Sequence, residues 1–245
     1  MNASLCTFLD WDSTFFGIRI ARLATAVLTP AVAADALKWC VLNRIDCLYF
    51  LGAADDSQTQ ALALAHGFQL VDTRTTLERR ISRDEDFDAS DSIRAARGAD
   101  LEALKAIART AHVDSRFFFD AHFSRERCAA LYETWIERSC GGGADAVFVA
   151  QADGGPAGYC TCHLSDDGCG SIGLVGIAAS ARGRGLGSEL LDSALRYFQA
   201  HGASRVQVVT QGRNTPAQRL YRRGGFLTGS VLVWYHNWLS ILPET

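Results

Sequence analysis

Residues 174–191 read LVGIAASARGRGLGSELL and join an apolar run to a glycine-rich loop and an amphipathic segment. The apolar run predicts a strand, and residues 186–199 carry apolar side chains at helical spacing. Between them, Gly183, Gly185 and Gly187 let backbone N–H groups converge without obstruction from Cβ atoms. Because a helix N-terminus carries partial positive charge, the loop predicts a cradle for an anion such as a pyrophosphate.

Three kinds of nucleotide-binding loop compete for this pattern, in which Arg182 and Arg184 add positive charge. A Walker loop requires Gly-Lys followed by Ser or Thr. A dinucleotide fingerprint requires Gly-x-Gly-x-x-Gly early in a βαβ unit, with an acidic residue about 20 positions later. The loop meets neither requirement. The third pattern, Arg-x-x-Gly-x-Gly, is matched by Arg182, Gly185 and Gly187, and a glycine-rich turn without a ligand is the remaining alternative.

A second motif occupies residues 214–226, which read NTPAQRLYRRGGF. Asn214 is suited to cap a helix, and Pro216 suits the first turn of that helix. Asn214 and Tyr221 are seven positions apart, which is two helical turns, so they share one face. The motif therefore predicts a capped helix that presents a tyrosine hydroxyl on the face of Asn214. A core aromatic ring is the alternative for Tyr221.

The two motifs in this order resemble the GNAT superfamily of N-acetyltransferases, over residues 92–235. The resemblance implies an α/β (α+β) GNAT fold with a mixed central sheet, and acetyl-CoA as co-substrate. It implies that Tyr221 protonates the coenzyme A thiolate. The residues implied to bind the cofactor are Val175, Gly176, Ile177, Arg182, Gly183, Arg184, Gly185, Leu186, Gly187 and Asn214.

Two further segments resemble bacterial GNAT enzymes that acetylate a dTDP-linked 4-amino-4,6-dideoxyhexose for surface polysaccharide synthesis. These are residues 11–17, which read WDSTFFG, and residues 114–137, which contain Ser-Arg-Phe. The resemblance implies a nucleotide-sugar amine as the acceptor substrate. Arg116 could bind its diphosphate through paired hydrogen bonds.

The aromatic rings and carboxylates of these segments supply the remaining acceptor-site candidates. Phe15 and Phe117 are implied to contact the acceptor, and Asp12 and Asp72 are candidates for the base that takes the amine proton. The alternatives are packing of the rings in the core, a surface or capping position for Asp12 and Asp72, and pairing of Arg116 with a nearby aspartate.

The acidic, polar stretch at residues 82–91 predicts a solvated linker between domains 1–85 and 92–245. A strand–helix–Gly-Phe–strand pattern occurs twice, over residues 48–77 and 206–233. The first copy predicts a smaller N-terminal α/β domain that resembles half of a GNAT fold and contributes to the acceptor site. Two explanations of the repetition stay open. One is a decayed duplication, and the other is that this arrangement is common in α/β units.

The C-terminal part otherwise predicts alternating helices and strands. A helix is expected to begin at Asp100 as its cap, and a second one to span residues 124–138. Strands at residues 146–151 and 158–164 are expected to form a hairpin through the turn at residues 153–156.

Composition places the chain among globular proteins, since 48% of its 245 residues are hydrophobic and 21% are charged. The net charge of −3 offers no concentrated basic surface, so neither nucleic acid nor an anionic membrane is an expected partner. The N-terminus lacks a basic region before an apolar core, and no apolar run reaches the length of a membrane helix. We therefore expect a cytoplasmic protein.

The eight cysteines are expected to be reduced thiols. Cys160, Cys162, His163 and Cys169 suggest a zinc site at first sight. A structural zinc site normally uses Cys-x-x-Cys pairs, whereas this spacing is Cys-x-Cys within an alternating, strand-like run. Buried thiols and no bound metal are therefore predicted.

Three functions stay open on the sequence. The first is acetylation of a nucleotide-linked deoxyaminosugar, and the second is acetylation of another amine, such as a protein N-terminus, a lysine or a small molecule. The third is a non-catalytic module that binds coenzyme A. A homodimer packed through helices near the N-terminus also stays open, because no heptad or exposed apolar stripe identifies an interface.

Overall fold

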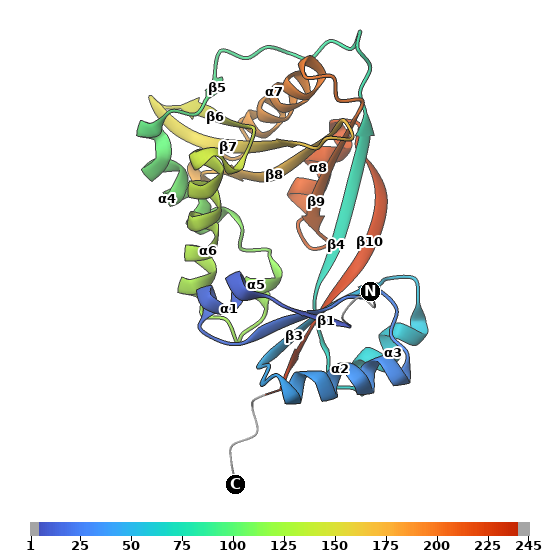
Figure 1. Cartoon of the computed structure of the whole chain (residues 1–245). Helices are drawn as coiled ribbons and strands as arrows, with labels where there is room; N and C mark the ends of the chain where they lie inside the picture. Colours follow the sequence, from blue (N-terminus) through green and yellow to red (C-terminus); the bar gives the residue numbers. More distant parts are fainter. Residues whose placement is uncertain (1–4, 240–245) are drawn as a thin grey trace. The chain divides into compact units, whose positions relative to one another are not determined.

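The structure is a computed structural model that describes residues 5–239 (Figure 1). These residues form two compact units. Unit 1 contains residues 5–74, 119–123 and 231–239, and unit 2 contains residues 75–118 and 124–230. The predicted domains, 1–85 and 92–245, have different boundaries from these two units, and they remain a prediction.

Unit 1 has strands in the order β1-β2-β3-β10-β4, with β3 parallel to β2 and antiparallel to β10. Two of these strands, β4 and β10, also contribute residues to unit 2. The strands are β1 (Cys6–Phe8), β2 (Ile20–Leu23), β3 (Cys47–Ala53), β4 (Gln69–Arg80) and β10 (Leu227–Trp238), and the helices are α1 (Asp10–Phe16), α2 (Pro30–Leu42) and α3 (Ser57–Ala65). Buried aromatic rings hold the unit together, with Phe50 stacked on Tyr235 at 5.6 Å between centroids.

Unit 2 has strands in the order β10-β4-β9-β8-β7-β6-β5, with β8 and β9 parallel. Its own strands are β5 (Ile93–Ala95), β6 (Ala146–Ala152), β7 (Gly155–Leu164), β8 (Cys169–Ile177) and β9 (Arg205–Gln211). The helices are α4 (Leu101–Ala111), α5 (Arg116–Phe119), α6 (Arg125–Arg138), α7 (Leu186–Ala200) and α8 (Thr215–Arg223). The mixed sheet and the α/β class are thereby confirmed.

Helices cover both faces of the β6–β8 sheet (Figure 1). A Cβ atom on Gly158 would lie 3.5 Å from Leu190 of α7. The next residue of β7, Tyr159, has its hydroxyl 2.7 Å from Nε2 of His112, directly after α4. Since successive side chains of a strand point to opposite faces, α7 covers one face and α4 the other.

The repeated strand–helix–Gly-Phe–strand pattern is confirmed in both copies. Gly67 ends the first helix with φ +81°, and Gly225 ends the second with φ +78°. This left-handed conformation is the one that glycine adopts most readily. Phe68 and Phe226 then enter the cores of their units, with 2% and 1% exposure. Both explanations of the repetition remain open.

The beginning of α4 differs from the prediction. Asp100 occupies the predicted N-cap position, but its side chain makes no capping hydrogen bond to α4, and a single turn of 3₁₀ helix, Gly98–Asp100, precedes the helix. The carboxylate instead accepts two hydrogen bonds from the Arg94 guanidinium, at 2.7 and 2.8 Å, and one from the Arg97 N–H. This pairing with Arg94 lowers the pKa of Asp100 to about 2. The predicted helix at 124–138 is confirmed, with Ser124 as its cap.

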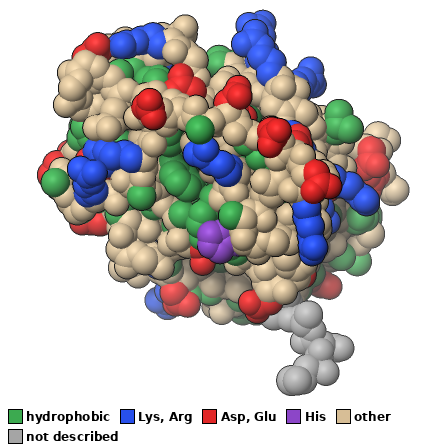
Figure 2. Space-filling view, turned by 90° about the horizontal axis from the view of Figure 1, so that it is seen from above, with side chains coloured by type: hydrophobic (Ala, Val, Ile, Leu, Met, Phe, Trp, Pro, Cys, Tyr) green, Lys and Arg blue, Asp and Glu red, His purple; other side chains and the backbone are tan. Residues whose placement is uncertain are grey.

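The surface charges of the molecule are of both signs. On the face drawn in Figure 2, basic and acidic side chains are interspersed. Cys160, Cys162 and Cys169 are buried, as predicted for thiols in a strand. Within residues 5–239, no helix is both long enough and apolar enough to cross a membrane.

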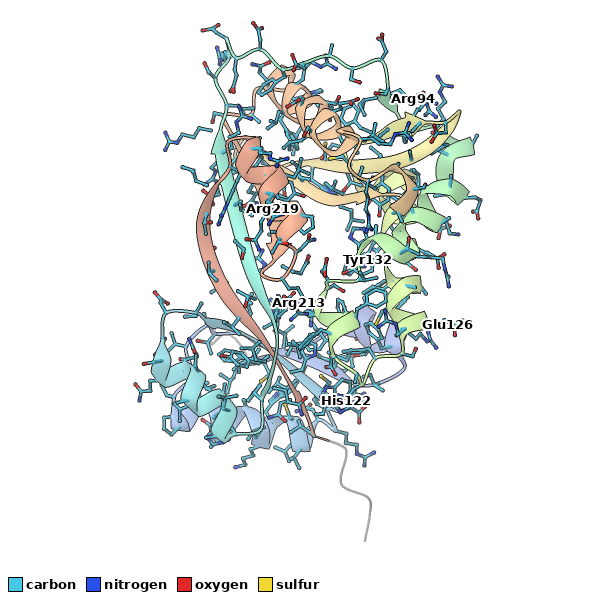
Figure 3. The ribbon with its side chains drawn as sticks, turned by 180° about the vertical axis from the view of Figure 1, so that it is seen from behind. Arg94, His122, Glu126, Tyr132, Arg213 and Arg219 are labelled. Atoms are coloured by element: carbon cyan, nitrogen blue, oxygen red, sulfur yellow. The ribbon has the colours of Figure 1, made fainter. Side chains whose placement is uncertain are left out.

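A buried carboxylate, Asp120, connects two distant segments of unit 1. Its Oδ2 accepts hydrogen bonds from Nδ1 of His236 at 2.6 Å and Nε1 of Trp238 at 2.9 Å. Its Oδ1 accepts one from the His122 N–H at 3.0 Å and lies 2.7 Å from Nδ1 of His122, which is labelled in Figure 3. Burial by itself would raise the pKa of Asp120, but these hydrogen bonds outweigh it and hold the pKa well below its usual range.

Replacing Asp120 by alanine should lower the free energy of unfolding by about 2–3 kcal/mol at pH 7, because buried donors lose a charged acceptor. The folded carboxyl stays ionised below the pH near 4 at which the unfolded one protonates, so this stabilisation fades as the pH falls below about 4. Denaturant unfolding at pH 7 and below pH 4 measures this difference in stability. Asp55→Ala, at an exposed carboxylate in the same unit, is the control. Equal stability of Asp120→Ala and wild type at pH 7 would contradict the role.

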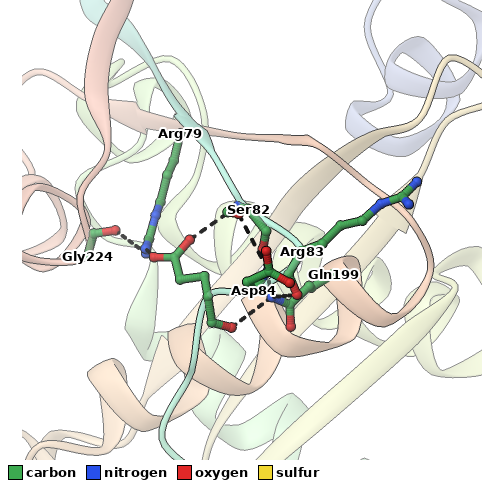
Figure 4. A network of polar contacts seen from close by, with 7 residues as sticks. Arg79, Ser82, Arg83, Asp84, Gln199 and Gly224 are labelled. Carbon is green, nitrogen blue, oxygen red and sulfur yellow. Dashed lines mark hydrogen bonds and ion pairs between the residues drawn. The ribbon is translucent and has the colours of Figure 1, made fainter.

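The predicted linker is irregular, as expected, but it is hydrogen-bonded along α7 (Figure 4). The side-chain amide nitrogen of Gln199 lies within 3.2 Å of the carbonyl oxygens of Ser82, Arg83 and Glu85. Arg79 donates to the carbonyl oxygen of Gly224 at 2.6 Å and forms an ion pair with Glu85. The beginning of the acidic stretch, residues 82–85, is therefore held to unit 2 by these contacts.

Candidate active site

Strand β8 separates from its neighbour β9 halfway along its length. The ladder between them runs from Cys169↔Arg205 to Ile172↔Val208, whereas pairing with β7 continues to Ile177. Backbone groups of residues 173–177 on the β9 side are therefore outside this ladder. Such an edge can pair with an extended chain that carries amides. Val175, Gly176 and Ile177, which were predicted to bind the cofactor, lie on this edge.

The loop after β8 provides a second set of backbone groups. Gly183 and Gly185 have φ values of +78° and +86°, so the predicted need for glycine is confirmed at both positions. Gly185 is the N-cap of α7 and contributes no side-chain hydrogen bond to it. The N–H groups of Ser188 and Glu189 bond to the carbonyl oxygen of Gly185. A helix N-terminus that its N-cap side chain does not cover suits an anion.

Gly187 lies where α7 meets α8. A Cβ atom there would lie 3.4 Å from a methyl group of Leu220, an ordinary van der Waals distance, so this packing does not itself require glycine. Any contact of Gly187 with the cofactor would come from its backbone.

The charges around the loop are partly neutralised within the protein. Arg184 forms an ion pair with Asp153, with N–O distances of 2.6 and 3.3 Å, and this pairing lowers the pKa of Asp153. The pair is exposed, so its contribution to stability is small. Glu189, in the first turn of α7, accepts hydrogen bonds from the hydroxyls of Ser90 and Ser92, which lower its pKa.

The helix of the second motif begins as predicted. Oδ1 of Asn214 accepts a hydrogen bond from the Ala217 N–H at 3.1 Å, and Pro216 lies in the first turn. The cap is therefore confirmed, while contact of Asn214 with the cofactor stays a prediction.

Replacing Asn214 by alanine should destabilise the protein by about 1 kcal/mol, since a helix N–H loses its acceptor. Asn214→Asp retains an acceptor oxygen and should recover most of the loss. Denaturant unfolding of the two variants measures the difference, and equal destabilisation by both substitutions would contradict the capping role.

Tyr221 is buried, with 4% exposure, and its ring packs 5.9 Å from that of Phe226. It belongs to the same core cluster as Cys160, which lies opposite Val175 in the β7–β8 ladder. Burial raises the pKa of the phenol, and the nearby Cys160 thiol raises it further. Tyr221 therefore remains protonated at neutral pH, in a position that is both packed and next to the strand edge.

Arg116 and Phe117 also belong to unit 2. The Arg116 guanidinium lies 4.2 Å from the centroid of the Phe117 ring. That ring is 4% exposed and meets Trp135 edge to face at 6.2 Å. The packing favours the core alternative for Phe117, and leaves Arg116 as the polar candidate of the segment.

The remaining predicted residues belong to unit 1, whereas Tyr221 belongs to unit 2. Phe15 stacks on Trp11 at 5.1 Å, and Asp12 lies in the first turn of the same helix, α1. Asp72 is buried in β4, where its Oδ1 accepts from the Thr73 N–H at 2.8 Å. The residues predicted to bind the cofactor all belong to unit 2, and their roles, like those of Phe15, Asp12 and Asp72, stay predictions.

A buried polar pair supports the strand edge from the α4 face. His112 bonds to the Tyr159 hydroxyl and stacks on Tyr132, which projects from α6 (Figure 3). Burial lowers the pKa of His112 to about 4, so the imidazole is neutral. The ring of Tyr159 passes over Gly176, where a Cβ atom would come within 2.8 Å of it. Sequence reasoning missed this contact, whose only signal is the alternation of residues in β7.

A hollow of about 350 Å³ opens on the same face of unit 2. It reaches β8 at Gly173 and Leu174, directly after the ladder with β9 ends at Ile172. Its lining residues are Trp135, Arg138, Ser139, Gly143, Thr161, His163, Gly173 and Leu174. The sequence singled out His163 only as a neighbour of cysteines, so the hollow was not predicted.

Comparisons with known proteins agree with this geometry. Residues 102–226 match the Acetyltransferase (GNAT) family. The dTDP-fucosamine acetyltransferase of Escherichia coli O6:H1 is 28% identical over 232 residues, which cover 94% of this chain and 96% of that protein. Spore coat polysaccharide biosynthesis protein SpsD of Bacillus subtilis is 30% identical over 139 residues, covering 57% of this chain and 48% of that protein. The predicted resemblance is therefore confirmed.

Solved structures show the same fold. A GCN5-related N-acetyltransferase from Sphaerobacter thermophilus has a TM-score of 0.65 at 18% identity, covering 95% of this chain and 76% of that one. A conserved protein of unknown function from Staphylococcus epidermidis has a TM-score of 0.66 at 16% identity, covering 97% and 92%. With the family match extending over half of its length, the chain belongs to the GNAT family of acetyltransferases.

Proposed function

We propose that the protein transfers an acetyl group from acetyl-CoA to the amino group of a nucleotide-linked deoxyaminosugar, of the dTDP-4-amino-4,6-dideoxyhexose type, for surface polysaccharide synthesis. The proposed substrate is supported by the near full-length similarity to dTDP-fucosamine acetyltransferase and by the similarity to SpsD. The observation that carries the reaction is the open edge of β8, which continues directly into the glycine loop and α7.

The backbone would bind the co-substrate. N–H groups from Gly183 to Gly187 would hold the pyrophosphate at the start of α7. The edge formed by Val175, Gly176 and Ile177 would pair with the amides of the pantetheine arm and orient the thioester carbonyl, so that the reacting atoms are held in position. Acetyl-CoA supplies the activated acetyl group.

Tyr221 would act as the general acid. Its phenol remains protonated because burial raises its pKa, so it can donate the proton that the departing thiolate takes. This role is supported by the core cluster that Tyr221 shares with Cys160, since Cys160 lies opposite Val175 in the β7–β8 ladder. Asp12 and Asp72 remain predicted candidates for the base.

Arg116 would bind the diphosphate of the acceptor, so Arg116→Ala should raise KM for the nucleotide sugar about 10–150-fold, the loss of a charge-assisted contact worth about 1.5–3 kcal/mol. KM for acetyl-CoA should change little. Arg125 lies over the ring of Phe118 at 5.4 Å, so Arg125→Ala is a matched control in which an Arg–Phe contact is also lost. Equal increases of both KM values in steady-state kinetics would indicate a structural role for Arg116.

Ligand-induced stabilisation tests the proposed pair of substrates without requiring turnover. Acetyl-CoA at a hundredfold excess over its Kd should stabilise the protein by about 2.7 kcal/mol. Among nucleotide sugars and lysine peptides, a dTDP-linked amino sugar should raise Tm further, and a shift produced by the peptides alone would favour acetylation of a protein amine.

A further inference from the structure

The hollow of unit 2 is built on an irregularity in the ladder between β7 and β8. Cys160 lies opposite Val175, but Cys162 lies opposite Ile172, so Gly173 and Leu174 together face the single residue Thr161. Oγ1 of Thr161 accepts a hydrogen bond from the Leu174 N–H at 2.8 Å. A bulge of this kind bends the strand and redirects its side chains.

The bulge brings the imidazole of His163 against the backbone of β8. A Cβ atom on Gly173 would lie 2.7 Å from Nε2 of His163, so only glycine leaves room for the ring in this position. Gly173 is exposed, and it is the first residue of β8 beyond the ladder with β9. A nitrogen able to accept a proton therefore lies at the point where the open edge begins.

His163 and Tyr221 lie on opposite faces of the sheet that contains β7 and β8. Tyr221 shares a core cluster with Cys160 and Cys162, on the α7 face. Because side chains alternate along a strand, His163 lies on the other face, where Trp135 and Arg138 of α6 line the hollow. A carbonyl group aligned along β8 would have a proton acceptor on one face and a proton donor on the other.

We infer that His163 is the base of the acetyl transfer and that the hollow receives the amine-bearing ring of the acceptor against Trp135; this assignment rests on the proposed function. The amine reacts in its neutral form. As its nitrogen bonds to the acetyl carbon, one N–H proton passes to Nε2 of His163. As the C–S bond breaks, the sulfur takes the phenol proton of Tyr221. Exchange with water restores both side chains, so an amine and a thioester become an amide and a thiol.

The charged group that lines the hollow beside His163 is Arg138 of α6, while β7 and β8 contribute Thr161, Gly173 and Leu174, which do not titrate. Histidine is the side chain that enzymes use most often as a general acid or base, so an imidazole nitrogen in this position suits the transfer of the amine proton.

The test is kcat for acetylation of dTDP-4-amino-4,6-dideoxygalactose, measured where chemistry limits the rate. His163→Gln should lower kcat about 10²–10⁴-fold and leave KM for acetyl-CoA nearly unchanged. Added imidazole should restore part of the activity of His163→Ala, an effect that a merely structural role would not produce. His201→Gln, at an exposed histidine directly after α7, is the control and should behave as wild type.

Two results would overturn the assignment. One is a kcat of His163→Gln within about threefold of wild type. The other is a His163→Ala variant that imidazole does not rescue, together with a loss of kcat of about 10²–10⁴-fold in Asp72→Asn or Asp12→Asn. If wild type acetylates a lysine peptide but no nucleotide sugar, the proposed substrate fails, and the same variants on that peptide still decide whether His163 is the base. If wild type acetylates neither, both proposals fail.

Discussion

Replacing Tyr221 by phenylalanine is expected to lower kcat about 10²–10⁴-fold, the usual contribution of a positioned general acid. The substitution removes only the hydroxyl and keeps the ring that packs against Phe226, so stability should hardly change. KM for acetyl-CoA should also change little, because the proton is required only as the thiolate leaves.

The pH dependence adds a second signature of Tyr221. Its raised pKa means that the phenol loses its proton only above the usual value near 10, so kcat should not decline through this group below about pH 10. Tyr197→Phe, the same chemical change on α7, is the control. If chemistry limits the rate and Tyr221→Phe retains a kcat within about threefold of wild type, water or another group protonates the thiolate.

Replacing Gly185 by valine is expected to weaken coenzyme A binding about 10²–10⁴-fold. The branched side chain would enter the loop where two or more backbone N–H groups meet the pyrophosphate, and each lost charge-assisted contact costs about 1.5–3 kcal/mol. Gly185 has φ +86°, so any side chain there also strains the backbone.

A second glycine separates this strain from the loss of binding. Gly202, just beyond the C-cap of α7, has φ +79°, and a Cβ atom there would meet nothing within 4 Å. Gly202→Val should therefore share the strain and keep full affinity in calorimetric titration with coenzyme A. Equal affinity of the Gly185 and Gly202 variants would contradict the loop assignment.

Much of the fold could be predicted because its signals are local. The predicted hairpin turn contains Asp153 and Gly154, which both have positive φ, and Asn214 caps its helix as expected. Strand β10 extends beyond the repeated pattern, which ends at residue 233, and reaches Trp238, where its polar residues His236 and Asn237 are buried and it pairs with β3. That pairing joins residues far apart in sequence, so no local pattern reveals it.

The candidate site also combines features that a local motif predicts with features that it does not. The glycine loop and Tyr221 were predicted because each lies within one short motif. The end of the ladder at Ile172↔Val208, the bulge opposite Thr161 and the ion pair of Arg184 with Asp153 depend on contacts between separate elements. Such contacts leave no trace in spacing or composition, which explains why the hollow beside His163 was missed.

The most direct test of the proposed function is mass spectrometry of the products after incubation with acetyl-CoA and an equimolar mixture of dTDP-4-amino-4,6-dideoxygalactose and a lysine peptide. We expect one acetyl group on the amino sugar, release of coenzyme A in equal amount, and an unmodified peptide. Acetylation of the peptide with the nucleotide sugar left unchanged would contradict the proposed function.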